Sequence, residues 1–451
     1  MRRGAALRIG AGSAWWGDRI SPAALNAERG DLDYLCFETM AESTVSAAQV
    51  RARRDPSFPG YDTYLDDRFR AVLPHCLKRG TRIISNQGWV NPVGAARRVK
   101  TLLAEHGAPD WKVAAITGNI ITDRIGTLGA RLLETSEPVE SIANPIISAE
   151  AYLGAAPIVE ALKAGAKVVI TGRVADPSLF LAAMMVEFDW DEHDVAHLGP
   201  GAGVGHLLEC GAQVTGGYFA DPGYKDVPEP WNLAFPIAEV APDGSAVITK
   251  VEGTGGVVNR MTVLEQMFYE VHDPANYITP DVVVDFTSAE IEEQGKDRVR
   301  VSAIGGKPRT PTLKVSIGAA DGFIGEDMFF YAGPGALGRA RLADTILRER
   351  FRIVGLSAED LRIDLLGVNA IHGPASPPPV HEPYEVAVRV AARAKSRAEA
   401  EKIGREVDAM AVSGVGHTGK RVPHGERVRE VIGIWSALVP RDTVVPEIQF
   451  V

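Results

Sequence analysis

Cysteine is scarce in this sequence. Only three cysteines occur among 451 residues, and Cys36, Cys76 and Cys210 are scattered along the chain. An odd number at such spacing is inconsistent with a disulfide framework, and it lacks the paired cysteines of a zinc site. The sequence therefore fits a protein of a reducing compartment.

Long apolar runs are also missing. No run approaches the roughly 20 apolar residues that span a bilayer. The first residues, MRRGAALRIGAG, carry basic side chains without the apolar stretch of a secretory signal. We therefore predict a cytoplasmic protein without a membrane partner.

Positive charge is not in excess. The net charge of −10 argues against a broad phosphate-binding surface, although a local basic pocket for one anionic ligand is compatible with it. We expect no nucleic acid partner and a small acyl molecule as the ligand. We also expect the protein to form a homo-oligomer.

Complete nucleotide-binding fingerprints are absent as well. GAGSAWWGD has Gly10 and Gly12, but Trp15 occupies the place of the third glycine in G-x-G-x-x-G, where a bulky indole obstructs close helix packing. GPGAGVGH (199–206) and GPGALGR (333–339) fail the same test and lack the Gly-Lys-Ser/Thr ending of a phosphate-binding loop. We therefore predict no cofactor, apart from coenzyme A as part of a thioester substrate.

One pair of histidines has the spacing of metal ligands. In WDEHDVAH (190–197), His193 and His197 would share one helical face. The sequence lacks the Glu directly after the first His that serves metalloproteases as a base. A solvated helix end explains these charges better, so we predict no metal site.

Alternating apolar patterns are abundant, and the length suits two or three domains. Residues 1–190 alternate short apolar runs with amphipathic ones, which is typical of βα units around a mostly parallel sheet. The predicted strands are LRIG (7–10), LDYLCFE (32–38), TRIIS (81–85), WKVAAIT (111–117) and AKVVITG (166–172), and helices are predicted at 64–80 and 92–107.

We predict an α/β protein in three parts. A mostly parallel α/β domain with helices on both faces of its sheet covers 1–227. A mixed α+β domain covers 228–373, with a hairpin around Asp243 and Gly244 and a strand LKVSIG (313–318) that ends at a glycine-rich turn. The proline-rich segment at 373–383 is predicted to be an extended linker, and a small α+β unit of βαβ type follows at 384–451.

Polar residues follow each of the five predicted strands. They are Ser13 in the first loop, Glu38 to Glu42 after the second strand, Asn86, Gln87 and Asn91 after the third, Asn119 after the fourth, and Arg173 and Asp176 after the fifth. Because the carboxyl ends of parallel strands meet at one edge of a sheet, these five loops are expected to form one rim, where ligand crevices occur.

Arg173 is the strongest single candidate on this rim. In TGRVADPS (171–178), Asp176 and Pro177 are explained as a helix cap and a first helical proline. An arginine at the end of a buried strand is not explained that way, and it could clamp a carboxylate or phosphate. Ion pairing within the fold is the alternative.

Carboxylates and amides nearby could complete a site. Glu38 comes straight off a buried strand and could act as a general base with a pKa raised by burial. Glu42 fits the start of a helix better. Asn86 and Gln87 could bind a carbonyl or carboxylate oxygen, whereas Asn91 before Pro92 is typical of a helix cap.

The segment LECGAQVTGGYFADPGYKD (208–226) has the greatest density of polar groups. His206 and Cys210 are four residues apart, so a helix would place a base beside a thiol nucleophile. A cysteine in an apolar helix is more often a small core residue. Glu209 and Lys225 remain candidates in what is first of all a shaped loop.

Several segments resemble the acyclic terpene utilisation family AtuA. They are RIGAGSAWWGDRI, LDYLCFETMAEST, VVITGRVADPSLFLA, GHLLECGAQVTGGYFADPGYKD, FPIAEVAPDGSAVITK, YEVHDPANYITPDVVVDFT, LKVSIGAADGFIGE and RIDLLGVNAIHG, in order over nearly the whole chain. The resemblance implies a role in the breakdown of branched or isoprenoid acyl chains, alongside acyl-CoA carboxylases, hydratases and dehydrogenases. The reactions of this breakdown that those enzymes leave unassigned are hydration, dehydration or C–C cleavage of a branched acyl-CoA or its acid.

We predict a hydro-lyase (hydratase or dehydratase) that acts on a small branched or oxygenated carboxylate or its CoA thioester. Arg173 would hold the anionic group and Glu38 or Glu209 would move the proton. The predicted substrate-binding residues are Ser13, Asn86, Gln87, Asn119, Asp176, Lys225, Gly255 and Gly256. The alternatives are a hydrolase or acyltransferase that uses Cys210 and a non-catalytic subunit that binds an acyl-CoA.

Overall fold

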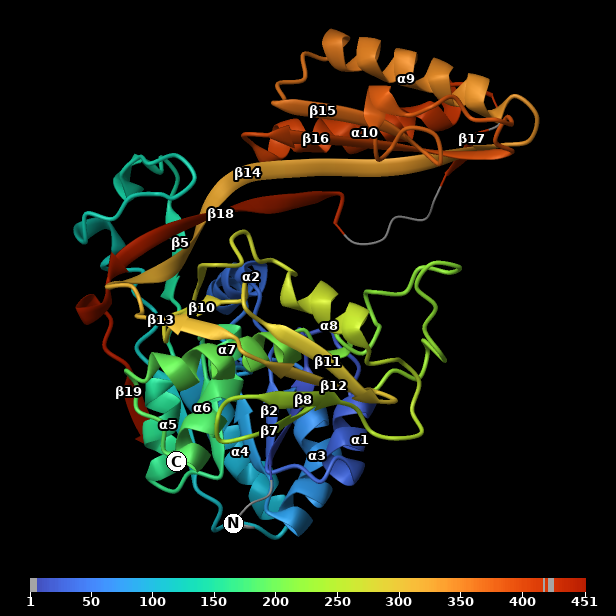
Figure 1. Cartoon of the computed structure of the whole chain (residues 1–451). Helices are drawn as coiled ribbons and strands as arrows, with labels where there is room; N and C mark the ends of the chain where they lie inside the picture. The colour runs from blue at the N-terminus through green and yellow to red at the C-terminus, as the bar shows by residue number, and fades with distance from the viewer. Residues whose placement is uncertain (1–5, 417, 421–425) are drawn as a thin grey trace. The chain divides into compact units, whose positions relative to one another are not determined.

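The computed structural model describes residues 6–416, 418–420 and 426–451. The chain forms two compact units (Figure 1). Unit 1 comprises Met1–Gly318 and Ile434–Val451, and unit 2 comprises Ala319–Gly433. Unit 2 is therefore an insertion in the sequence of unit 1.

This division differs from the three consecutive domains expected from the sequence. Strand β14 (Thr312–Ala332) is 21 residues long and belongs to both units. The sequence predicted that LKVSIG would end at a glycine-rich turn, but pairing with β16 (Glu385–Ala394) continues along the strand to Ala332. Gly322 does adopt a positive φ of 79°, but pairing with β16 begins at the next residue, Phe323, and the strand continues.

Unit 1 is built around a sheet in which ten strands are described. The five strands expected from the sequence are parallel neighbours at its centre, in the order β1 (Leu7–Ser13), β2 (Tyr34–Phe37), β3 (Arg82–Ser85), β6 (Val168–Thr171) and β4 (Val113–Thr117). Antiparallel strands extend both edges, namely β7 (Ile237–Val240), β8 (Ala246–Thr249), β12 (Arg298–Ser302) and β11 (Glu290–Gly295) beyond β1, and β19 (Glu447–Phe450) beyond β4. The expected hairpin at Asp243 and Gly244 joins β7 to β8.

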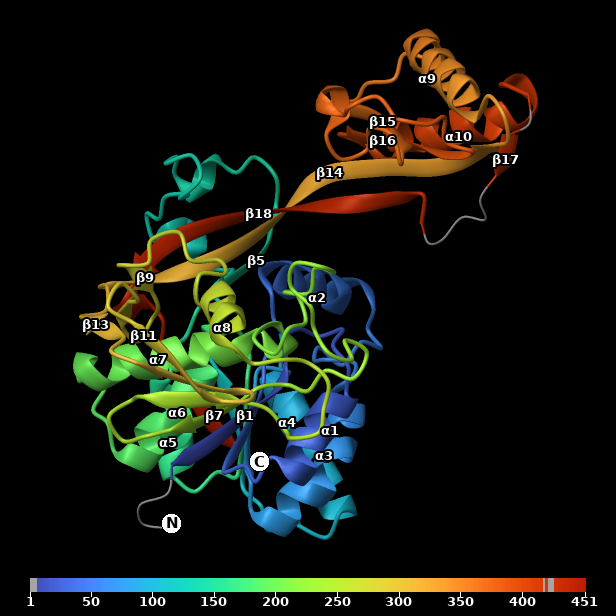
Figure 2. The ribbon, with the colours of Figure 1, turned by 45° about the vertical axis from the view of Figure 1, so that its right-hand side comes forward.

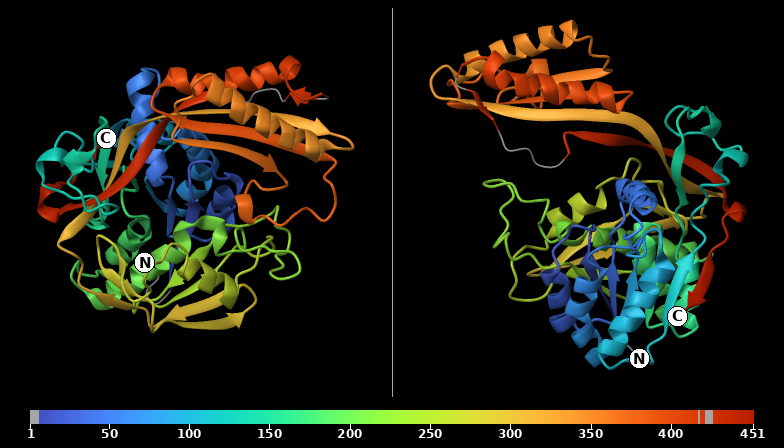
Figure 3. Two further views of the ribbon diagram at one scale, coloured as in Figure 1. Left: turned by 90° about the horizontal axis from the view of Figure 1, so that it is seen from above. Right: turned by 180° about the vertical axis from the view of Figure 1, so that it is seen from behind.

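Helices cover both faces of the parallel strands, as expected (Figures 1 and 3). One layer contains α1 (Ser21–Arg29), α3 (Leu65–Arg79) and α4 (Pro92–Glu105), and the other contains α5 (Ala156–Lys163), α6 (Asp176–Phe188) and α7 (Val195–Glu209). The central strands are mostly apolar between their ends because both faces are covered, and Ile9, Leu35, Ile84, Val169 and Ile116 are fully buried.

The glycine cluster GPGAGVGH lies inside α7, not in a phosphate-binding loop. A Cβ on Gly199 would lie 2.4 Å from the carbonyl oxygen of Gly305, and one on Gly205 would lie 2.6 Å from that of Pro177. These glycines therefore let α7 pack closely against its neighbours, which the sequence pattern alone did not reveal.

Smaller elements complete unit 1. They are α2 (Glu42–Arg54), α8 (Arg260–Met267), the three-stranded sheet of β9 (Tyr277–Ile278), β10 (Val283–Asp285) and β13 (Gly305–Lys307), and β5 (Ile146–Ala151), which pairs with β14. Strand β18 (Val428–Pro440) pairs with β14 and returns the chain to unit 1 (Figure 2).

Unit 2 is an antiparallel sheet with two helices. Its strands are arranged in the order β15 (Asp360–Leu366), β16, β14 and β17 (Thr418–Lys420), and α9 (Ala336–Ile353) and α10 (Arg397–Ser413) pack on β16. The proline-rich segment at 373–383 connects β15 to β16 inside this unit, so it does not separate domains. The described strands β16 and β17 both pair with β14 in antiparallel orientation, so they run parallel to each other with α10 between them along the chain, as in the βαβ-type unit expected after this segment.

No helix in the described part of the chain combines the length and apolarity that crossing a membrane requires.

Candidate functional site

Arg173 leaves the carboxyl end of β6 and is held by the end of β5. The chain after β6 forms a parallel bridge between Val174 and Leu153, and the Ala175 N–H donates to the Leu153 carbonyl at 2.9 Å. This bridge brings the ring of Tyr152 over the guanidinium of Arg173, 4.2 Å from its carbon. A cation above an aromatic face is electrostatically favoured.

The guanidinium of Arg173 is buried and only partly satisfied. Its side chain is 2% exposed, and its Nη2 donates to Asp176 at 2.8 Å. Its Nε and Nη1 have no hydrogen-bond partner among the described residues. A buried donor without a partner costs about 1–3 kcal/mol, so Arg173 has unused capacity for an anionic ligand.

Arg173 and Asp176 line a cavity of about 240 Å³. Its wall contains charged, aromatic and apolar groups from α2, β14, α6 and the segments around β5, β9 and β18. The lining residues are Glu42, Tyr152, Arg173, Ala175, Asp176, Pro177, Glu270, Tyr277, Ile278, Thr279, Pro280, Thr310, Thr312, Leu313, Lys314 and Leu438.

Glu42 is an ionised residue in the wall of this cavity. It is the first residue of α2, where the helix dipole favours negative charge, as the sequence predicted. The Tyr152 hydroxyl and the Lys314 ammonium both donate to its Oε1. Burial raises the pKa of Glu42, but Arg173, Tyr152 and Lys314 outweigh it and lower the pKa to about 2.

Glu38 does not line the cavity, but the charges of the lining residues Asp176 and Arg173 act on its pKa. Its Oε1 accepts from the amide of Asn86 at 3.0 Å and from the Met40 N–H at 2.5 Å. Burial, followed by the charge of Asp176, raises the pKa of Glu38 well above its usual value. The Ser13 hydroxyl donates to the backbone carbonyl of Glu38, so Ser13 fixes this loop.

Glu209 pairs with a histidine that the sequence pattern had placed beside Cys210. His206 Nδ1 lies 2.7 Å from Glu209 Oε1, and both side chains are buried. Burial lowers the pKa of His206 to about 4, whereas burial and the charge of Asp176 raise that of Glu209. Burial also raises the pKa of the Cys210 thiol, which opposes thiolate formation.

Asn119 forms a hydrogen bond with a second buried carboxyl group, that of Glu150. Its amide donates to Glu150 Oε2 at 2.9 Å, and Gln49 donates to Oε1 at 2.8 Å. Burial raises the pKa of Glu150 to about 7 even though Gln49 and Arg173 lower it. The lining of the described cavity includes neither Asn119 nor Glu150.

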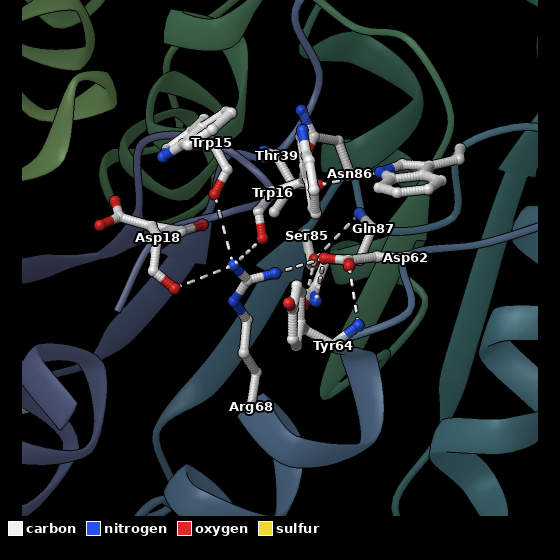
Figure 4. Close-up of polar contacts among 12 residues, drawn as sticks. Trp15, Trp16, Asp18, Thr39, Asp62, Tyr64, Arg68, Ser85, Asn86 and Gln87 are labelled. Atoms are coloured by element: carbon white, nitrogen blue, oxygen red, sulfur yellow. Dashed lines mark hydrogen bonds and ion pairs between the residues drawn. The ribbon is translucent and has the colours of Figure 1, made fainter. Parts of the chain in front are cut away.

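Gln87 belongs to a buried network below the first glycine loop (Figure 4). Arg68 of α3 pairs with Asp62 where both side chains are 0% exposed, and Gln87 donates to the same carboxylate at 2.9 Å. Arg68 also donates to the carbonyl of Trp16 at 2.6 Å and to that of Trp15 at 3.3 Å. Asn86 and Gln87 therefore hold loops together, and the residues described around the cavity do not include them.

The remaining predicted residues lie elsewhere. Lys225 forms an ion pair with Glu265 at 2.8 Å. Gly255 and Gly256 form close backbone contacts with Glu229 and Thr215, respectively, which accounts for these glycines by packing.

A second cavity of about 730 Å³ contains Gly256 in its wall. Its basic residues Arg8 and Arg298 both pair with Glu239, and Lys250 pairs with Asp297 at 3.2 Å. The wall also contains Arg29, which donates to the carbonyl of Glu252, and Lys296. Because Arg8, Arg298 and Lys250 are already paired with carboxylates, this cavity gives weaker support for an anion site than Arg173 does.

The two histidines with metal-ligand spacing do not share a helical face. Helix α7 begins at Val195, so His193 precedes it, and His197 Nδ1 contacts Asp194 at 2.6 Å. No group of three His, Cys, Asp or Glu side chains among the described residues is arranged to hold a metal ion.

Sequence reasoning missed Tyr152, Tyr277 and Lys314 as cavity residues. Tyr152 follows a strand that the sequence pattern did not predict, and Lys314 lies on β14, far along the chain from Arg173. The alternation in LKVSIG did predict a strand there, but no local signal connects Lys314 to the rim.

Comparison with known proteins identifies the family of this chain. A comparison with curated proteins gave no match. The family model for the acyclic terpene utilisation family protein AtuA matches residues 7–450. The match covers the parallel sheet, the inserted unit and the edge strand β19, and the chain therefore belongs to the AtuA family.

Proposed function

We propose that this AtuA-family protein is an enzyme of the hydratase or dehydratase type, acting on a small carboxylate or its CoA thioester. The observation that carries the proposal is Arg173, which lines a cavity and whose buried guanidinium has two nitrogens, Nε and Nη1, without a hydrogen-bond partner among the described residues. A permanently charged planar donor set matches a carboxylate.

The neighbouring carboxyl groups supply proton-transfer chemistry. Asp176 lines the cavity beside Arg173, and its side chain is 31% exposed. Burial raises the pKa of Asp176 despite the charge of Arg173. The negative charge of Asp176 in turn raises the pKa of Glu38 and Glu209. Ionisation of one of these three carboxyl groups therefore disfavours ionisation of the others, an arrangement typical of acid–base sites.

The reaction in the dehydration direction would proceed as follows. Arg173 holds the carboxylate and stabilises charge that develops on its oxygens. Asp176 removes the proton from the adjacent carbon, the C–O bond at the next carbon breaks, and Lys314 protonates the leaving hydroxide. A carbon–carbon double bond and water result, and the proton on Asp176 returns to Lys314 through solvent.

Glu38 and Glu209, predicted from the sequence as the proton-moving groups, are assigned a supporting role in this proposal. Neither is among the residues that line the described cavity. Their protonation state sets how readily Asp176 accepts a proton, because like charges oppose one another. Glu38 is fixed by Asn86, and Glu209 is fixed by His206.

The test is turnover in D₂O with 3-hydroxy-3-methylbutanoate and its CoA thioester as probes, followed by NMR. We expect deuterium incorporation at C2 and water elimination from one of them. Asp176→Asn should lower the rate about 10²- to 10⁴-fold, whereas Asp360→Asn, an exposed carboxylate of unit 2, should not change it. Turnover undiminished in Asp176→Asn would refute the assignment.

Binding of a probe without any turnover would instead favour the non-catalytic acyl-binding subunit. A hydrolase or acyltransferase that uses Cys210 would require this half-buried thiol, whose pKa is raised, to ionise. It predicts a covalent intermediate, which intact-protein mass spectrometry would detect during turnover.

A further inference from the structure

The backbone of Glu270 has a conformation that long side chains rarely adopt. Glu270 follows the end of α8, and its φ is 59°. Many helices are followed by a residue in the left-handed region, and glycine is the usual one because it has no Cβ that clashes there. A glutamate at such a position is strained where a glycine would not be. Folding alone therefore does not explain the choice of this residue.

Glu270 also lines the 240 Å³ cavity that contains Asp176. Eight non-glycine residues of the described structure have a positive φ, and Glu270 is the one among them that lines this cavity. Residues in strained conformations cluster at active sites, where the surrounding structure holds them in place. This placement indicates that the side chain of Glu270 serves the cavity.

The charge of Glu270 is not compensated, in contrast to the other two carboxylates of the cavity wall. Glu42 is paired with Lys314, and Asp176 is paired with Arg173. Glu270 forms no ion pair with a basic side chain in the described part of the chain. Its charge therefore acts on its neighbours. Burial is the main cause of the raised pKa of Asp176, and the charges of Glu42 and Glu270 add to it.

We propose that Glu270 is a positioning residue of the site, held in the left-handed conformation so that its negative charge lies near Asp176 and makes Asp176 a stronger base. This inference rests on the proposed function, in which Asp176 removes the proton. It adds a residue that acts through Asp176 without touching the reacting atoms.

Other charged and titratable groups interact with Asp176, so Glu270 sets only part of its protonation. They are Arg173, Glu42 of α2, Glu38 after β2, Tyr152 after β5, His206 and Glu209 of α7, Cys210, and Tyr277 of β9. These groups are the same in the wild type and in a Glu270 variant. A difference in the titration of Asp176 between the two proteins therefore reports on Glu270.

Carbon-13 NMR of protein labelled at the aspartate side-chain carboxyl carbon follows the titration of Asp176, and Asp176→Asn assigns its signal. We expect the midpoint to fall in Glu270→Gln and Glu270→Gly, because a charge that favours the protonated form of Asp176 is removed. Glu270→Asp keeps the charge, and aspartate tolerates the left-handed region better, so it should shift the midpoint least. At about 1 M salt, where the Debye length is about 3 Å, the difference between the wild type and Glu270→Gln should shrink.

Turnover gives a second readout. Asp176 must be ionised to accept a proton, so the acid limb of the pH–rate profile should move to lower pH in Glu270→Gln. At pH values above that limb the variant should be about two- to fivefold slower, because a less basic carboxylate is a weaker general base.

Thermal unfolding separates this role from a structural one. Glu270→Gly relieves the left-handed strain, so its Tm should equal that of the wild type or exceed it by up to about 3 °C. Glu229→Gly is the matched control, since Glu229 is an exposed glutamate with a φ of 43° that does not line this cavity. It should not lower the Tm either, and it should leave the titration of Asp176 and the rate unchanged.

Each outcome bears on one hypothesis. The same Asp176 midpoint in the wild type, Glu270→Gln and Glu270→Gly would overturn the inference, and so would a Tm of Glu270→Gly clearly below that of the wild type. A lowered midpoint, but no turnover in any of these proteins, would leave the action of Glu270 on Asp176 standing and overturn the proposed function. Turnover that needs Asp176, with a midpoint independent of Glu270, would leave the proposed function standing and overturn the inference.

Discussion

The Arg68–Asp62 pair gives the sharpest stability prediction. Both side chains are 0% exposed, and the pair fixes the loop that carries Trp15 and Trp16 (Figure 4). Asp62→Asn leaves a guanidinium that stays protonated at any ordinary pH. Breaking a buried ion pair from one side costs about 3–5 kcal/mol, and we expect a loss of unfolding free energy in this range.

The reverse change should behave differently. In Arg68→Met the remaining carboxyl group can take up a proton, which costs about 1.4 kcal/mol for each pH unit above its pKa. Burial already raises the pKa of Asp62 in the presence of Arg68, and loss of the cation raises it further. The folded-state pKa then exceeds the unfolded value, so stability is present at low pH and is lost as the pH rises through the folded-state pKa.

Tryptophan fluorescence during urea unfolding is a suitable assay. All seven tryptophans lie in unit 1, so the signal reports on the unit that contains the pair. We expect the loss of unfolding free energy relative to the wild type to stay large at both pH 5 and pH 8 in Asp62→Asn, and to be smaller at pH 5 than at pH 8 in Arg68→Met. A loss below about 1 kcal/mol in Asp62→Asn, or an Arg68→Met variant without pH dependence, would refute the reasoning.

Three further predictions concern other buried groups. Because burial raises the pKa of Glu150 from 4.5 to about 7, the stability that this group contributes below pH 4.5 is lost as the pH rises through 7. Glu150→Gln should remove about 3 kcal/mol of that pH dependence in urea unfolding at pH 4.5 and 8. Gly205→Ala, whose methyl group would meet the backbone of Pro177 at 2.6 Å, should cost about 1–3 kcal/mol in thermal unfolding. Gly338→Ala, whose methyl group would meet nothing within 4 Å in the described structure, should not destabilise α9. Cys210→Ser should retain turnover. Iodoacetamide should label the half-buried Cys210 slowly in the folded protein, as judged by mass spectrometry, because the raised pKa of the thiol keeps the thiolate scarce.

The parallel sheet was predictable because its signal is local. Five apolar runs, each followed by polar residues, correspond to β1, β2, β3, β4 and β6. Parallel strands that are buried on both faces leave this pattern in any sequence. The insertion of unit 2 left no such signal, because β14 and β18 pass from one unit to the other without a change in composition.

The candidate site was predictable only in part. Arg173 was identified because a permanent charge at the end of a buried strand needs a partner. Asn86 and Gln87 were also polar residues on the rim, but Glu38 and Asp62 use their amides. These partners come from loops 25 to 48 residues away in sequence, so pairing within the rim could not be distinguished from ligand binding.

The interrupted sequence of unit 1 has a consequence for biosynthesis. Its edge strand β19 and the cavity residue Leu438 follow the inserted segment. Every residue of unit 2 therefore leaves the ribosome before unit 1 can complete its sheet. Domains generally fold in the order of their synthesis. Here synthesis of unit 2 begins after that of unit 1 but is complete before it. Nonsense mutations in unit 2 would consequently remove a strand and a cavity wall from the unit that precedes them.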